Sequence, residues 1–250
     1  MLNAKQKQYI LQLSEFLPDR RAGKRGTKPI DKVVLLTELF KLIKFNLGWR
    51  NINHSTTVRY YFFECQRRGL LKLFLKKLRG NINIKRFKKV IIDSSEFESW
   101  KNQLLVSYSS KSKTYSTKIS IEVTPECKFL DYIFSKGSAS DSIELDKLYA
   151  NRKELPYELF MDKGYERYSR RREYKQIGCQ VRMEQKTFGN NKKKGKRFSF
   201  TKEDKKTRAL IEKTFGWIKS FNAIRYNRLK TASLFHGFVG LVLGYYSFNR

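Results

Sequence analysis

Apolar side chains recur every three or four residues in the first part of the chain. One such series runs over residues 9–17 and a second over residues 33–43. This spacing is typical of helices that bury one face. A third series, over residues 55–78, opens with serine and threonine side chains that are able to cap a helix. The pattern therefore predicts a small all-α domain over residues 1–82.

The pattern changes after residue 82 to short apolar runs that are rich in β-branched residues. Val90 to Ile92 leads into Asp93, residues 118–123 alternate as KISIEV, and residues 129–134 read FLDYIF. Three runs of this kind predict an antiparallel meander. Later strands alternate with helices, which are expected over residues 140–148, 165–177 and around 208–219. We therefore expect an α/β domain over residues 83–250, with a mixed sheet flanked by helices.

The charge of the chain indicates a polyanionic partner. Lysine and arginine outnumber aspartate and glutamate by 54 to 23, which gives a net charge of +31 and a pI near 10.1. Hydrophobic residues make up 40% of the chain, which is too much for a chain that stays unfolded. Nucleic acid is the commonest polyanion that such proteins bind. The alternatives are a cationic surface that serves only solubility and one that touches an anionic membrane.

Neither end of the chain indicates a membrane protein. Residues 1–16 are amphipathic and polar, unlike a signal peptide, and the apolar stretch 234–248 is too short and too often interrupted by glycine to span a bilayer. We expect a soluble, cytoplasmic protein, associated with a nucleoid of the bacterial type. Three distant cysteines and two histidines indicate neither a disulfide framework nor a zinc site.

Basic residues gather in two segments of the predicted helical domain. The loop 18–29 carries five cations, including Lys24 and Arg25, and would follow a phosphate backbone or stay solvated. Arg59, Arg67 and Arg68 lie on the segment 55–78. A DNA-binding module of the helix-turn-helix sort fits this pattern, and a merely structural helical cap is the alternative.

Three carboxylates are candidates for chemistry. Asp93 and Asp162 each follow three apolar residues, and strand ends are where open sheets present reactive groups. Glu212 lies in a helical stretch, four residues after Arg208 and seven before Lys219, so that all three lie along one stripe. Carboxylate oxygens suit Mg²⁺ or Mn²⁺, which support phosphoryl transfer. Taken singly, each acid also fits a solvated charge, and the two cations also fit ordinary pairing with Glu212.

The motifs around these acids resemble those of insertion-sequence transposases of the DDE class, most closely the insertion-sequence-five-type families. The stretch RALIEKTFGWIK, residues 208–219, reproduces the R-x3-E-x6-K signature of that group. IIDSSEF around Asp93 and MDKGY around Asp162 resemble the blocks of the first two acids, and KISIEV with SASDS resembles the region between them. Residues 47–78 are similar to the N-terminal helical region. One departure is Lys205, where many relatives carry tyrosine.

The resemblance implies a fold, an activity and a set of roles. It implies an RNase H-like catalytic domain preceded by a small all-α DNA-binding domain. Asp93, Asp162 and Glu212 would hold Mg²⁺ or Mn²⁺, and the contacts to DNA would come from a set of cations that comprises Arg208, Lys219, Lys163, Arg59, Arg67, Arg68, Lys24 and Arg25. The protein would bind the inverted repeats of its element, cleave double-stranded DNA and transfer the strand to target DNA, as a homodimer in the synaptic complex.

Three other interpretations stay open at this point. A catalytically silent DNA-binding relic of a transposase would keep the acids without using them, and another RNase H-like nuclease would cut without joining. An RNA-binding protein fits the composition but explains none of the acid spacing. Asp141, in the block SASDS, is interpreted as a helix cap and not as a fourth metal ligand, and the run KKKGKR at 192–197 as a loop that follows DNA or is solvated.

Overall fold

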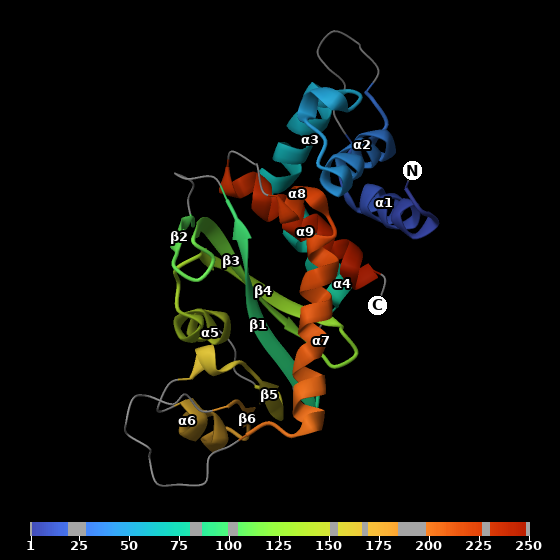
Figure 1. Cartoon of the computed structure of the whole chain (residues 1–250). Helices are drawn as coiled ribbons and strands as arrows, with labels where there is room; N and C mark the ends of the chain where they lie inside the picture. The colour runs from blue at the N-terminus through green and yellow to red at the C-terminus, as the bar shows by residue number, and fades with distance from the viewer. Residues whose placement is uncertain are drawn as a thin grey trace. The chain divides into compact units, whose positions relative to one another are not determined.

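The computed structural model describes residues 2–19, 29–80, 87–99, 105–150, 155–166, 170–184, 199–226 and 231–248. The chain forms two compact units, whose elements are labelled in Figure 1. The helical unit comprises Met1–Gly80 and Trp217–Arg250, and the sheet unit comprises Asn81–Gly216. The apolar pattern predicts a single domain over residues 83–250, whereas residues 217–250 belong to the same unit as the N-terminal helices.

The helical unit consists of α1 (Ala4–Phe16), α2 (Lys32–Phe45), the 3-10 helix η1 (Trp49–Asn51), α3 (Ser55–Arg67), α4 (Leu70–Arg79), α8 (Asn222–Arg225), α9 (Ala232–Phe248) and the end of α7 (Lys202–Lys219). Two of these helices begin at side-chain caps. At α1, the Asn3 side chain accepts from the backbone of Gln6, whose side chain accepts from the backbone of Asn3. At α2, Asp31 accepts from the backbone nitrogen of Val33 at 2.6 Å. Each cap satisfies backbone donors that a helix start leaves unpaired.

The apolar series over residues 55–78 forms two helices, not one. Gly69 takes a φ of 69°, a left-handed conformation that ends α3 and precedes α4. His54 is the residue before α3 and makes no side-chain capping bond. The serine and threonine residues that follow His54 therefore lie inside the helix and do not cap it.

Helix α9 explains why the end of the chain belongs to the helical unit. Its residues from Leu234 to Tyr246 are almost all buried, and it packs against α4 and α1. A Cβ atom at Gly244 would lie 2.5 Å from the hydroxyl of Tyr9, which donates to the carbonyl of Leu241 at 2.9 Å. A helix that is apolar on nearly every side must be covered by other elements. Among the described residues, no helix combines the length and the apolar character that crossing a membrane would need.

The described part of the sheet unit holds six strands: β1 (Lys89–Glu98), β2 (Ser107–Ser109), β3 (Thr114–Val123), β4 (Phe129–Lys136), β5 (Glu158–Phe160) and β6 (Gln180–Arg182). Their order is β2-β3-β1-β5-β6, and β4 also pairs with β3. The antiparallel meander predicted from the apolar runs is formed by β1, β3 and β4. Strand β5 runs parallel to β1, and β6 runs parallel to β5. The sheet is therefore mixed, as predicted.

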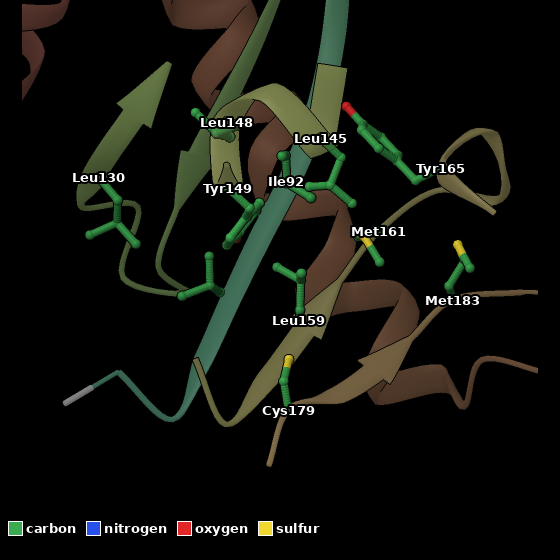
Figure 2. Close-up of a cluster of buried hydrophobic side chains, with 11 residues drawn as sticks. Ile92, Leu130, Leu145, Leu148, Tyr149, Leu159, Met161, Tyr165, Cys179 and Met183 are labelled. Atoms are coloured by element: carbon green, nitrogen blue, oxygen red, sulfur yellow. The ribbon is translucent and has the colours of Figure 1, made fainter. Parts of the chain in front are cut away.

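Helices flank this sheet: α5 (Asp141–Tyr149), the 3-10 helix η3 (Lys163–Tyr165), α6 (Arg170–Gln176) and most of α7. Val90 and Ile92 of β1 lie in a buried core with Leu145 of α5, and Figure 2 shows this cluster between helix and sheet. Because side chains alternate along a strand, Ile91 and Asp93 point to the opposite face. The α/β fold class with flanking helices is confirmed, and β1 presents different residues to its two faces.

Candidate active site

Asp93 and Asp162 each lie two residues after a position at which the neighbouring parallel strands β1 and β5 pair. Ile91 of β1 is in register with Phe160 of β5, and each aspartate follows its paired residue by two positions. Asp162 is the residue that precedes η3, and Met161 separates it from the end of β5. Parallel strands present equivalent positions at the same height of a sheet, so the two carboxylates come close together. The apolar runs predict an aspartate at the end of each strand; Asp162 does follow β5, whereas β1 continues past Asp93 to Glu98 because it stays paired with β3.

Asp93 is held in a partly buried environment. Its side chain is 19% exposed, and one of its oxygens, Oδ1, accepts from the backbone nitrogen of Ser94 at 2.8 Å. Burial raises the pKa of the Asp93 carboxyl from 3.8 to about 6, against the lowering effects of the Ser94 bond and the Arg208 charge. The negative charges of Asp162 and Asp141 raise this pKa as well.

Arg208 of α7 places its guanidinium between the two aspartates. Nη2 lies 3.8 Å from Oδ2 of Asp93 and 3.7 Å from Oδ1 of Asp162. These distances allow electrostatic attraction but are too long for direct hydrogen bonds. The Nε of Arg208 is buried and has no hydrogen-bond partner in the described structure. The guanidinium therefore balances two carboxylates without being locked to either one.

Glu212 does not join this cluster. It lies one helical turn after Arg208 on α7, and it is exposed to solvent. Within the described residues, there is no group of three or more histidine, cysteine, aspartate or glutamate side chains that could hold a metal ion. The structure thus brings together Asp93, Asp162 and Arg208, with Glu212 nearby in sequence but outside the group.

The chemistry of the two aspartates fits a divalent cation. Oδ2 of Asp93 and Oδ1 of Asp162 converge on one positive group, and neither oxygen accepts a close hydrogen bond from it. Mg²⁺ and Mn²⁺ prefer hard carboxylate oxygens, and Mg²⁺ is commonly bound by one or two carboxylates together with water molecules. The pair is therefore suited to hold such an ion, and Glu212 would have to turn inward to add a third carboxylate.

The other cations named from the sequence lie in several places. Lys163 is exposed in η3, next to Asp162, whereas Lys219 is the last residue of α7 and belongs to the helical unit. On α3, Arg59 lies over the ring of Phe63. Arg67, also on α3, pairs with Glu64 at 3.0 Å, and Arg68 follows α3 and is exposed. Lys24, Arg25 and the run 192–197 lie outside the described residues.

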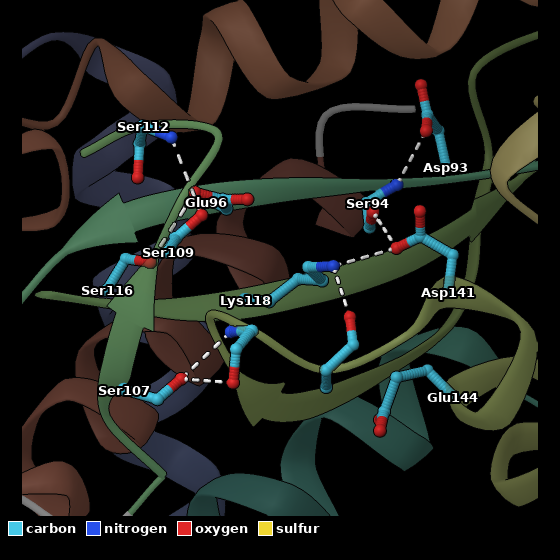
Figure 3. Close-up of polar contacts among 12 residues, drawn as sticks. Asp93, Ser94, Glu96, Ser107, Ser109, Ser112, Ser116, Lys118, Asp141 and Glu144 are labelled. Carbon is cyan, nitrogen blue, oxygen red and sulfur yellow. Dashed lines mark hydrogen bonds and ion pairs between the residues drawn. The ribbon is translucent and has the colours of Figure 1, made fainter. Parts of the chain in front are cut away.

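Asp141 has a different place from the one that the sequence suggested. Ser140 is the capping position of α5, and neither it nor Asp141 makes a side-chain capping bond there. Asp141 instead accepts from Ser94 Oγ at 2.7 Å and from Lys118 Nζ at 3.0 Å, as Figure 3 shows. The sequence carried one unused signal for this network: Lys118 is a charged residue in the strand KISIEV, where a buried position requires a partner.

Comparisons with known proteins agree with this fold. A family model described as a transposase DDE domain matches residues 85–247. Among solved structures, the chain is similar to a cryo-EM structure of the piggyBac transposase synaptic complex with hairpin DNA, with a TM-score of 0.54 and 8% sequence identity. The match covers 96% of this chain and 70% of that chain. At this identity the likeness concerns the fold alone. A search of curated proteins found no match.

Proposed function

We propose that this chain, since it belongs to the transposase DDE domain family, binds the terminal inverted repeats of an insertion sequence and carries out metal-dependent cleavage and strand transfer. The chain is a DDE transposase, a protein of DNA transposition and recombination. One observation carries the finer proposal: Asp93 and Asp162 converge on Arg208, each two residues after the paired positions Ile91 and Phe160 of neighbouring parallel strands.

The residues of the site have complementary roles in this proposal. Asp93 and Asp162 would hold Mg²⁺ or Mn²⁺, and Glu212 would be the third ligand if its side chain turned toward the pair. A divalent ion in this place supplies the Lewis acidity that activates a water or a DNA 3′-hydroxyl and neutralises the leaving oxygen. Arg208 balances the carboxylates before the ion binds, and its weakly held guanidinium is available to a phosphate of the DNA.

Double-stranded DNA is the proposed partner, both as transposon end and as target. The net charge of +31 supports this assignment, and so does the DNA in the similar piggyBac complex. We propose that the exposed Lys163 and the basic segments of the helical unit add phosphate contacts. We also propose that two copies assemble on paired ends, and that the protein acts in the cytoplasm, at the nucleoid.

The test is cleavage of DNA that carries the inverted repeats flanking the coding region. We expect Asp93→Asn, Asp162→Asn and Glu212→Gln to abolish Mg²⁺-dependent cleavage, with end binding retained, because each removes a charged ligand. Glu203→Gln is the matched control, since Glu203 is an exposed acid in the same helix. Products are resolved on denaturing gels. Strand transfer by any of the three variants would disprove the assignment.

A catalytically silent relic is the second candidate function. The exposed position of Glu212, outside the aspartate pair, is the observation that favours it. The same assay separates the two, because a relic binds the ends but does not nick them with Mg²⁺ or Mn²⁺. A nuclease of similar fold would release cut ends without joining them to target DNA.

A further inference from the structure

A buried polar network lies on the face of β1 opposite Asp93. Ser94 is at its centre: the backbone nitrogen of Ser94 donates to Asp93, and its hydroxyl donates to Asp141 at 2.7 Å on the other face. Figure 3 shows Asp93 and Asp141 on either side of this residue. The alternation of a strand makes this possible, since consecutive side chains point to opposite faces. One residue therefore connects Asp93 with a network that lies behind it.

Lys118 fixes the position of the Asp141 carboxylate. The side chain of Lys118 is 9% exposed, and its Nζ donates to Asp141 at 3.0 Å and to the carbonyl of Ala139 at 2.6 Å. A buried ammonium that lost its carboxylate partner would cost several kcal/mol. Asp141 is thereby held in place and neutralised, which distinguishes it from the aspartates that face Arg208.

The same carboxylate also abuts the loop that follows Asp162. A Cβ atom on Gly164 would lie 2.6 Å from Oδ2 of Asp141, so the absence of a side chain at 164 allows the close approach. Gly164 follows Asp162 by two residues and lies in η3. The two oxygens of Asp141 thus face different segments, with Oδ1 bound to β1 and β3, and Oδ2 packed against the loop of the second aspartate.

Arg170 fastens this loop to α5 at a second point. Its side chain is 1% exposed and donates to the carbonyls of Tyr165 and Ser142, and to Asp146 at 2.6 Å. Ser142 and Asp146 belong to α5, whose first residue is Asp141. The loop that carries Asp162 is therefore held against the start of α5, and α5 is held to β1 through Ser94.

We infer that Asp141 is a positioning residue, which sets the spacing of Asp93 and Asp162 by linking the strand of the first to the loop of the second. It acts through Ser94 and Gly164, and it does not hold the metal or touch DNA. This inference rests on the proposed function for its catalytic consequence, whereas the mechanical link between β1 and the loop is independent of that function.

The test substitutes Ser94, because Asp141→Asn would leave Lys118 buried without a counter-charge and would destabilise the fold for that reason alone. Ser94→Ala removes the link and keeps the pair of Asp141 and Lys118, and Ser94→Thr keeps the hydroxyl. Ser135→Ala is the matched control: Ser135 is buried opposite Lys118 on β4, and its hydroxyl has no hydrogen-bond partner in the described structure.

The first readout is catalytic. We expect Ser94→Ala to slow single-turnover cleavage of end DNA by about 10- to 100-fold, which is usual when a residue that orients a metal ligand is lost. The dissociation constant for end DNA should stay at its wild-type value, and the melting temperature should fall by only a few degrees, because a single hydrogen bond is lost. Ser94→Thr should restore the rate, and Ser135→Ala should leave it unchanged. Wild-type cleavage by Ser94→Ala would overturn the inference.

The second readout needs no activity. Hydrogen exchange followed by mass spectrometry reports on the backbone of Asp162 to Tyr165, where the Tyr165 nitrogen donates to the Asp162 carbonyl at 3.0 Å. Ser94→Ala should speed exchange in this loop, although the substitution is in β1, and Ser135→Ala should not. Unchanged exchange in Ser94→Ala would overturn the link. If the wild-type protein fails to cleave, the proposed function fails, and hydrogen exchange still decides the inference.

Discussion

Asp93 is a residue whose position favours chemistry over stability. Its carboxyl is largely buried beside a second acid, and Arg208, the cation that faces both, lies too far away for close hydrogen bonds. Burial of an acid disfavours its charged form, so the folded protein holds the proton of Asp93 more tightly than the unfolded chain does. Divalent cations compete with the proton for the same carboxylate oxygens. The cost of burying the charged form of Asp93 is therefore measurable in the metal-free protein.

We expect Asp93→Asn to stabilise the metal-free protein at neutral pH. The pKa of Asp93 is 3.8 in its ordinary state and about 6 in the folded protein, so its contribution to stability is present below pH 3.8 and is lost as the pH rises through 6. The free energy of unfolding of the variant should therefore exceed that of wild type by up to about 3 kcal/mol at pH 7.5. The two values should be equal at pH 3.5.

Guanidinium unfolding in EDTA at the two pH values measures this difference. Glu203→Gln, an exposed substitution, should behave as wild type at both. A variant Asp93→Asn that is less stable than wild type at pH 7.5 would show that the charged form of Asp93 stabilises the fold.

Elements with strong local patterns were predictable from the sequence, and elements shaped by distant contacts were not. The strands β1, β3 and β4 follow from their apolar runs, and so does the position of Asp93 at the end of one run. The break at Gly69 was missed because the apolar series continues through it, and only a left-handed φ separates the two helices. The Asp141 network was missed because its members are 23 and 47 residues apart in sequence.

Helix α9 depends on glycine where it meets α1. We expect Gly244→Ala to destabilise the protein by about 1–3 kcal/mol, because the added methyl group would displace the Tyr9 hydroxyl from its bond to Leu241. Gly216→Ala is the control, since a Cβ there meets nothing within 4 Å. It should stabilise helix α7 by about 0.5–1 kcal/mol. Thermal unfolding measures both, and equal effects of the two substitutions would contradict the close packing of α9.

The whole molecule carries a charge that few partners other than nucleic acid would balance. We expect the affinity for end DNA to fall steeply with salt, by about 10³- to 10⁵-fold between 50 and 200 mM if about six to ten phosphates are contacted. Lys24→Gln with Arg25→Gln should lower the slope of log K against log salt by about two, since each lost phosphate contact lowers it by about one.

Fluorescence anisotropy at a series of salt concentrations gives this slope. Lys41→Gln with Lys147→Gln is the matched control: it removes the same net charge, but these lysines already pair with Glu38 and Glu144 at 2.7 and 3.1 Å. The control should keep the wild-type slope. Equal slopes for the two double variants would show that Lys24 and Arg25 do not contact phosphates.

The helical unit takes its parts from both sides of the sheet unit in the sequence, and this has a consequence for synthesis. Helices α1 to α4 leave the ribosome first, but α9 follows only after all of Asn81–Gly216 has been made. At 5–20 residues per second this delay is on the order of ten seconds. The helical unit is therefore begun first and completed last. Until α9 is made, a chaperone or the nascent chain itself must cover the apolar faces of α1 to α4. A ribosome that stops within the sheet unit would release a chain whose helical part has no complete core.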